Sequence, residues 1–211
     1  MSVRAGWILL CLTVGAAPLV AQVPGWRVTA DSQVTLDTSI THSGHGSGHL
    51  RGLSPEDFQN LRQGLSPDSL RGHRVRFSAW VRTNLVEGTA GLWMRVDGEG
   101  MTDILAFDNM STRPIQGTTS WTRYEIVLDV PRGSAAIVLG ILMVGQGDVW
   151  LDDVVVEPVG ADVASTDMVA LLAAGPSHEG EEITQQDRER ILASRRAAPL
   201  RLRNPDFEQR P

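Results

Sequence analysis

The chain has 211 residues, a formal net charge of −6 and a pI near 5.3, a balance that argues against generic nucleic-acid binding, because such binding requires a basic face. Lysine is absent, so the strongly basic side chains are all arginines. The single cysteine, Cys11, lies in the apolar N-terminal stretch, so the rest of the chain can form neither disulfides nor cysteine-based metal sites or nucleophiles.

Residues 1–21 have the pattern of a secretory signal peptide. Arg4 supplies a positive charge, an apolar run follows from Trp7 to Val14, and small residues lead to Ala21. Cleavage after Ala21 would leave Gln22 as the new N-terminus, whereas an uncleaved anchor is the alternative. We therefore expect an extracytoplasmic protein, periplasmic or secreted, with no stable membrane span after cleavage.

Residues 22–160 form one predicted domain of short β-strands separated by turn signals such as Asp97-Gly98 and Arg132-Gly133. Many strands at short spacing, without helical segments between them, indicate an all-β antiparallel sandwich or barrel. The predicted strands are 26–29, 33–37, 48–52, 58–65, 73–83, 89–97, 104–108, 121–130, 135–144 and 148–157.

Alternation of apolar and polar residues assigns the faces of these strands. In 74–82 the apolar residues Val75, Phe77, Ala79 and Val81 share one face, opposite arginines and Trp80. The run 135–144 is apolar on both faces, which predicts a central strand. The residues predicted to be buried between two sheets are Phe77, Val81, Leu92, Met94, Ile126, Leu128 and Val138.

The composition changes after residue 160. We interpret residues 161–203 as a linker, partly helical or disordered, with a charged segment at 181–196 whose acidic start and basic end suit a short solvated helix.

Several separated motifs between residues 48 and 160 occur in the order found in a known module. The chain resembles the non-catalytic jelly-roll domain beside S41-type peptidase and erythromycin-esterase-like domains, and similar segments are attached to some AraC-type regulators. The resemblance implies a galactose-binding-like β-sandwich related to carbohydrate-binding modules, and a neighbouring catalytic domain encoded downstream. The motifs are Ala90–Asp97, Phe107–Met110, Arg113–Ile115, Gly117–Trp121, Tyr124–Pro131 and Trp150–Val154.

One departure from that module lies at the two ends of the chain. Such modules often open with an Asn-Leu-Asp-Phe-Glu-like strand before a Gly-Trp pair, whereas Gly25-Trp26 directly follows the predicted signal. A matching segment, Asn204-Pro205-Asp206-Phe207-Glu208, occurs instead near the C-terminus. Residues 204–211 could begin a second, truncated module, which we favour, or could pair back onto the sandwich as a displaced strand.

The predicted ligand-binding residues are Trp80, Arg82, Trp93 and Arg95. They occupy the polar faces of two successive predicted strands, and pairing of these strands as a hairpin would bring them together. Tryptophan faces flanked by guanidinium groups could stack on a sugar and bind its hydroxyl groups, with an acidic polysaccharide as one candidate ligand. The alternative is that the tryptophans are buried beneath a loop or the second sheet and that the arginines form ion pairs.

Three further sets of polar residues have structural alternatives. The resemblance implies that Asp152, in Asp152-Asp153, could hold a structural calcium ion, whereas a hydrogen-bonded acid is the alternative. Asp108-Asn109 beside Arg113 could clamp a polar ligand, although turn chemistry is favoured. His42, His45 and His49 cluster in a Gly/Ser-rich loop without a scaffold suited to zinc.

The sequence contains no recognisable catalytic motif, neither a Gly-x-Ser-x-Gly elbow nor a His-Glu-x-x-His pair, phosphate loop or dinucleotide fingerprint. We therefore predict a non-enzymatic binding module, with a structural or interaction domain as the alternative. We expect no cofactor other than the calcium ion considered above.

Overall fold

The computed structural model describes residues 23–29, 32–100 and 102–169, together with 189, 190, 193, 195 and 197–209. The predicted signal peptide lies outside these residues. Within them, no helix is long and apolar enough to cross a membrane.

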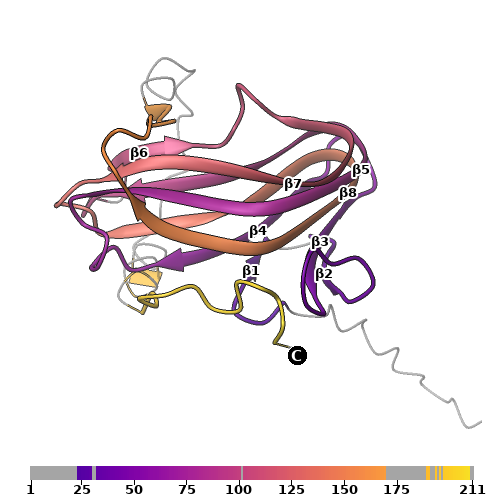
Figure 1. The fold of residues 1–211 in the computed structure, drawn as a ribbon, viewed down its shortest axis with the longest axis horizontal. Helices are drawn as coiled ribbons and strands as arrows, with labels where there is room; N and C mark the ends of the chain where they lie inside the picture. The colour runs from indigo at the N-terminus through magenta and orange to yellow at the C-terminus, as the bar shows by residue number, and fades with distance from the viewer. Residues whose placement is uncertain are drawn as a thin grey trace, which may run out of the picture.

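The described chain is an antiparallel jelly-roll β-sandwich (Figure 1). Two strands, β5 and β8, are much longer than the others and pair with each other along nearly their whole length. The strands are β1 (Arg27–Val28), β2 (Val34–Asp37), β3 (Ser47–Gly52), β4 (Phe58–Leu65), β5 (His73–Asp97), β6 (Ile104–Asp108), β7 (Ile115–Val130) and β8 (Ala136–Val159).

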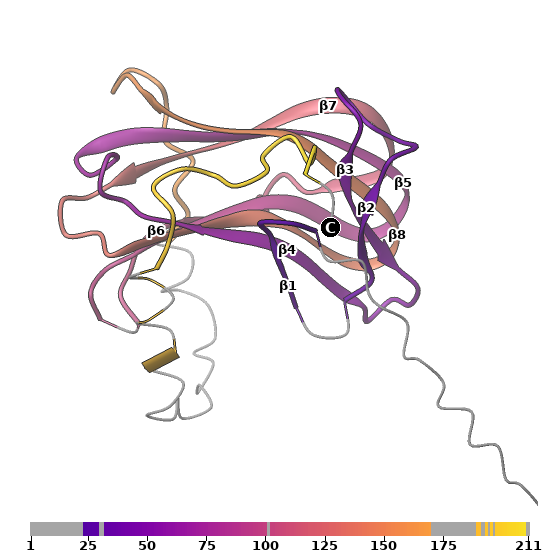
Figure 2. The ribbon, with the colours of Figure 1, turned by 90° about the horizontal axis from the view of Figure 1, so that it is seen from below.

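The long strands bend together and contribute to both layers of the sandwich (Figures 1 and 2). Layer A has the order β2-β3-β8-β5-β7 and uses residues 73–83 of β5 and 147–159 of β8. Layer B has the order β1-β4-β8-β5-β6 and uses residues 87–97 of β5 and 136–146 of β8.

Paired glycines make the bend possible. Gly88 of β5 faces Gly145 of β8, and both have positive φ angles, 116° and 105°. A Cβ atom on either residue would collide with the backbone of the opposite strand, because the two chains approach closely there. The sequence prediction divided β5 and β8 into two strands each at this bend, and the structure corrects that division.

The core lies between the two layers and follows the predicted alternation. Six of the seven predicted core residues are fully buried: Phe77, Val81, Leu92, Met94, Ile126 and Leu128. Val138 is the exception. Its neighbours Ile137 and Leu139 point inward, so Val138 points to the outer face of layer B and is only partly buried.

The C-terminal segment packs back onto the same sandwich. It follows the edge between β4 of layer B and β8 of layer A (Figure 2). Gln63 and Arg203 exchange two hydrogen bonds, and the Val154 amide donates to the Pro205 carbonyl. Phe207 is 1% exposed and belongs to the core cluster.

These contacts match the second alternative for residues 204–208, packing back onto the sandwich, although the segment forms turns and no regular strand. The alternative that the sequence favours, the start of a second module, stays a prediction.

The predicted linker also contacts the sandwich. The Thr166 and Met168 amides donate to the carbonyl oxygens of Val127 and Phe107. Residues 189, 190, 193 and 195 are helical, within the segment where a short helix was expected, whereas 170–188 lie outside the described residues.

Candidate functional site

A row of four residues crosses the outer face of layer B. Arg27 of β1 is the cross-strand partner of Arg62 in β4, Arg62 is the partner of Gly140 in β8, and Gly140 is the partner of Trp93 in β5. Gly140 has no side chain but is buried, because the Trp93 indole crosses over β8 toward β4, where its Nε1 donates to Asn60. The next row, Gly64, Val138 and Arg95, also begins with a glycine.

Apart from the covered Gly140, the residues of these rows line a pocket of about 380 Å³. One wall comes from the C-terminal segment, including Arg195, the residues 197–199 and Arg203. That segment is held in place because Arg195 forms an ion pair with Asp97 at 3.3 Å and the Ser66 amide donates to the Pro199 carbonyl at 2.8 Å. The pocket therefore depends on chain segments from both ends of the domain.

Trp93 has a fixed orientation at the pocket. Its indole Nε1 donates a hydrogen bond of 3.0 Å to Asn60 Oδ1 on β4, and the residue is 9% exposed. Both residues are on strands, so neither needs to be ordered when a ligand arrives. Preorganised aromatic side chains bind with a low entropic cost.

The lining of the pocket is rich in positive charge. Five arginines contribute to it, Arg27, Arg62, Arg95, Arg195 and Arg203, and Asp97 is the one acid among the described lining residues. Asp97 is 3% exposed and forms ion pairs with both Arg95 and Arg195. Burial, together with the charges of Arg27 and Arg95, lowers the pKa of the Arg62 guanidinium.

Trp80 and Arg82 lie on the outer face of layer A. The imidazole of His42 stacks on the Trp80 indole with a centroid distance of 4.0 Å and an interplanar angle of 14°, and Trp121 lies edge-on to His42. The Arg82 guanidinium lies 5.9 Å from the centroid of the Trp150 ring. One face of Trp80 is therefore occupied by the loop between β2 and β3.

The structure separates the four predicted ligand-binding residues into two pairs. Trp93 and Arg95 line the pocket on layer B, whereas Trp80 and Arg82 lie on layer A. The predicted hairpin is wrong, because all four residues belong to the single strand β5, on either side of its bend. Arg27, Arg62, Arg195 and Arg203 were not predicted, since only the strand register and the path of the C-terminal segment bring them to Trp93.

Asp152 is 0% exposed and accepts three backbone hydrogen bonds. Its Oδ2 accepts from the amides of His42 and Ser43, and its Oδ1 accepts from the amide of Asp153. Burial raises the pKa of Asp152 to about 6. The surrounding N–H groups turn their positive ends toward both oxygens, so this environment does not fit a calcium ion, which requires converging oxygen ligands.

Two of the three histidines bind separate partners, His42 in the loop before β3 and His49 on β3 itself. His42 Nδ1 lies 2.6 Å from Asp153 Oδ2, whereas His49 Nε2 lies 2.8 Å from Asp148 Oδ1 and its ring stacks on Trp150. Across the part of the chain that the structure describes, no group of three or more His, Cys, Asp or Glu side chains could hold a metal ion.

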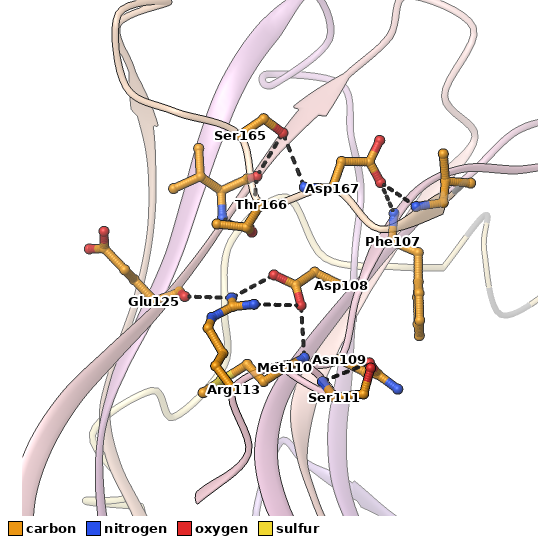
Figure 3. Close-up of polar contacts among 12 residues, drawn as sticks. Phe107, Asp108, Asn109, Met110, Ser111, Arg113, Glu125, Ser165, Thr166 and Asp167 are labelled. Carbon is orange, nitrogen blue, oxygen red and sulfur yellow. Dashed lines mark hydrogen bonds and ion pairs between the residues drawn. The ribbon is translucent and has the colours of Figure 1, made fainter. Parts of the chain in front are cut away.

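Asp108 and Asn109 follow the turn chemistry that the sequence favoured (Figure 3). Asp108 Oδ1 accepts from the Met110 amide at 2.7 Å, and Asn109 Oδ1 accepts from the Ser111 amide at 3.1 Å. Arg113 binds both carboxylate oxygens of the fully buried Asp108 and also donates to the Glu125 carbonyl. This cluster therefore orders the loop between β6 and β7.

Sequence comparison identifies one curated relative and no matching family model. The chain is 40% identical over 154 residues to the uncharacterized HTH-type transcriptional regulator YbfP of Bacillus subtilis strain 168. The match covers 70% of this chain and 52% of the relative, so the chain spans about half the length of that protein.

Solved structures show the same fold at low sequence identity. The enzymatically active domain of tailspike protein 4 from bacteriophage CBA120 matches with a TM-score of 0.51 and 14% identity, over 66% of this chain and 20% of that one. The CBM22-1-GH10 modules of Clostridium thermocellum endo-1,4-beta-D-xylanase 10B, complexed with xylohexaose, match with a TM-score of 0.50 and 16% identity, over 70% and 28%. The predicted jelly-roll fold is thus confirmed, whereas an association with peptidase or esterase domains stays a prediction.

Proposed function

We propose that this chain is a non-catalytic, extracytoplasmic module that binds carbohydrate in the pocket on layer B. The observation that carries the proposal is the position of Trp93, fixed by Asn60 in the lining of an arginine-rich pocket. An aromatic ring beside planar hydrogen-bond donors can contact both the C–H face and the hydroxyl groups of a sugar.

The contrast between the two tryptophans of β5 supports this choice of site. The Trp80 ring is covered on one face by His42, whereas Trp93 lines a pocket. The fold agrees with this proposal, because one of the similar structures contains a carbohydrate-binding module and was determined with xylohexaose.

The test compares binding by Trp93→Ala and Trp80→Ala. A glycan array identifies saccharides that bind the mature protein, and isothermal titration calorimetry then measures their affinities. We expect Trp93→Ala to weaken binding at least tenfold, and Trp80→Ala, the matched control from the same strand, to bind as the wild type does. If Trp93→Ala binds every array ligand as well as the wild type, the pocket is not the carbohydrate site.

A structural or interaction domain is the second candidate, and one observation favours it. The curated relative is named as a transcriptional regulator, and this chain matches about half of it, which is the arrangement expected if the module couples to a second domain. A protein that binds no saccharide on the array, but retains its fold, would favour this candidate.

The extracytoplasmic location is tested separately. Mass spectrometry of the cell-envelope and secreted fractions should find a mature chain beginning at Gln22. An intact Met1 on protein in the cytoplasmic fraction would contradict the location without affecting the binding site.

A further inference from the structure

The pocket on layer B holds more positive charge than its own acid neutralises. Asp97 forms ion pairs with Arg95 and Arg195, at 2.7 Å and 3.3 Å. Arg27, Arg62 and Arg203 form no ion pair with another described residue. This excess occurs in a chain whose net charge is −6, so it is a local feature of the pocket.

Arg62 stands out within this set. It lies in the centre of the row between Arg27 and Gly140, it is partly buried, and two other arginines are near enough to lower its pKa. A partly desolvated cation beside like charges destabilises a folded protein unless an anion offsets it. No contact within the described fold explains the position, so a bound anion is the simplest reason for it.

The geometry also places the anion relative to a sugar ring. The Trp93 indole crosses β8 and bonds Asn60, which lies on β4 two residues before Arg62, so the indole and Arg62 border the same pocket. Gly64, in the adjacent row, has no atom within 4 Å of the position that a Cβ would take, so the pocket is open there. A sugar ring bound over Gly64 would share this pocket with the indole and the Arg62 guanidinium.

We propose that the pocket selects acidic saccharides, with Arg62 and Arg27 binding the acid group while the ring contacts Trp93. This inference rests on the proposed function and narrows its ligand class. The acid group is a carboxylate or a sulfate ester, since the planar guanidinium fork binds either through two parallel hydrogen bonds.

The test uses matched acidic and neutral oligosaccharides in calorimetric titrations. Trigalacturonate is compared with its methyl ester, and sulfated carrageenan oligosaccharides are compared with neutral galactose oligosaccharides. We expect at least one acidic probe to bind ten times or more tightly than its neutral partner, with an affinity that falls as salt rises. The pair that shows this difference identifies the carboxylate or the sulfate as the acid group.

Two variants separate pocket recognition from general charge attraction. Arg62→Gln should reduce the affinity for the preferred acidic probe about tenfold and that for its neutral partner by a smaller factor. Arg51→Gln, the control, removes the same charge from β3 on layer A, where the side chain is 63% exposed, and should bind the acidic probe as the wild type does.

A second measurement does not depend on the choice of probe. Without ligand, Arg62→Gln should unfold at the same temperature as the wild type or at a higher one, because it removes a partly buried charge. The acidic probe should then raise the unfolding temperature of the wild type more than that of the variant.

Each outcome distinguishes this inference from the proposed function. Equal affinity for acidic and neutral partners, or equal losses in Arg62→Gln and Arg51→Gln, overturns acid selectivity while the carbohydrate site stands. If neither acidic nor neutral saccharides bind, the proposed function fails too. If sodium acetate or sodium sulfate displaces the acidic probe as effectively as the saccharide itself does, the pocket is an anion site without sugar recognition, which also overturns the inference.

Discussion

The rings of Trp26 and Phe207 stack with centroids 5.2 Å apart and an interplanar angle of 13°. Trp26 Nε1 also donates to the Asn204 carbonyl, and the Asn204 amide group donates to the Pro24 carbonyl. The two ends of the described chain thus share one packed cluster at the edge of the sandwich.

The first prediction concerns this cluster. Phe207→Ala should lower the free energy of unfolding by about 3–5 kcal/mol, because it leaves a cavity in the core where Phe207 is now 1% exposed. Denaturant melts measure the loss, with Leu200→Ala as the control, since Leu200 is in the same segment but exposed. A loss below about 1 kcal/mol would show that the C-terminal segment does not contribute to the core.

The second prediction concerns Asp152 and pH. Burial raises the pKa of Asp152 to about 6, above the ordinary value of 3.8, so the folded state binds a proton more readily than the unfolded state does. Stability should therefore increase as pH falls from about 7.5 to about 4.5, by about 2 kcal/mol from this group alone. The increase in stability should end near pH 4. Below that pH, carboxylates such as Asp129, whose pKa is lowered by its hydrogen bond to Arg74, become protonated and lose the stabilisation that this bond provides.

Asp152→Asn isolates this contribution. The variant should lose most of the dependence on pH between 4.5 and 7.5, whatever its absolute stability. Denaturant melts at several pH values provide the comparison. An unchanged slope in the variant would assign the pH dependence to other groups.

The third prediction compares Gly140 and Gly64, two glycines of the rows on layer B. Gly140→Ala should destabilise the fold severely, because its Cβ would collide with the Leu61 carbonyl oxygen of the neighbouring strand. Gly64→Ala should change stability by no more than about 1 kcal/mol, since its Cβ would have no atom within 4 Å. Thermal melts of the two variants and the wild type measure these changes in stability. Equal effects of the two substitutions would mean that β4 and β8 do not approach as closely as the structure has them.

The fourth prediction concerns the loop between β6 and β7. Arg113→Gln should cost about 3 kcal/mol, because it removes the charged partner of the fully buried Asp108. The double variant Asp108→Asn/Arg113→Gln should be less destabilised than the sum of the two single variants, as a double-mutant cycle in denaturant melts would show. Additive losses would mean that the two side chains act independently.

Period-two alternation was enough to predict most of the fold. It placed Phe77 and Leu92 in the core and predicted β4 and β6 with their observed bounds. It failed at Gly88 and Gly145, because glycine in a strand bend and glycine in a turn look the same in a sequence. It also failed at Val138, since an apolar residue that lines a pocket cannot be told from one in the core.

The candidate site was only partly predictable, for a different reason. Trp93 and Arg95 could be chosen from the polar face of one strand. Their partner Arg62 could not, because it reaches them through the registers of β4 with β8 and of β8 with β5, which no local pattern encodes. Arg195 could not be predicted as a site residue either, because it reaches the pocket only through the return of the C-terminal segment along the sandwich.

The proximity of Pro24 and Asn204, joined by a hydrogen bond of 3.1 Å, has an architectural consequence. A domain whose chain enters and leaves at one place can be inserted into a surface loop of a host protein without forcing the host's flanking residues apart. The same proximity makes the module a candidate for circular permutation, with a short peptide joining residues 209 and 23 and new ends opened in an exposed turn.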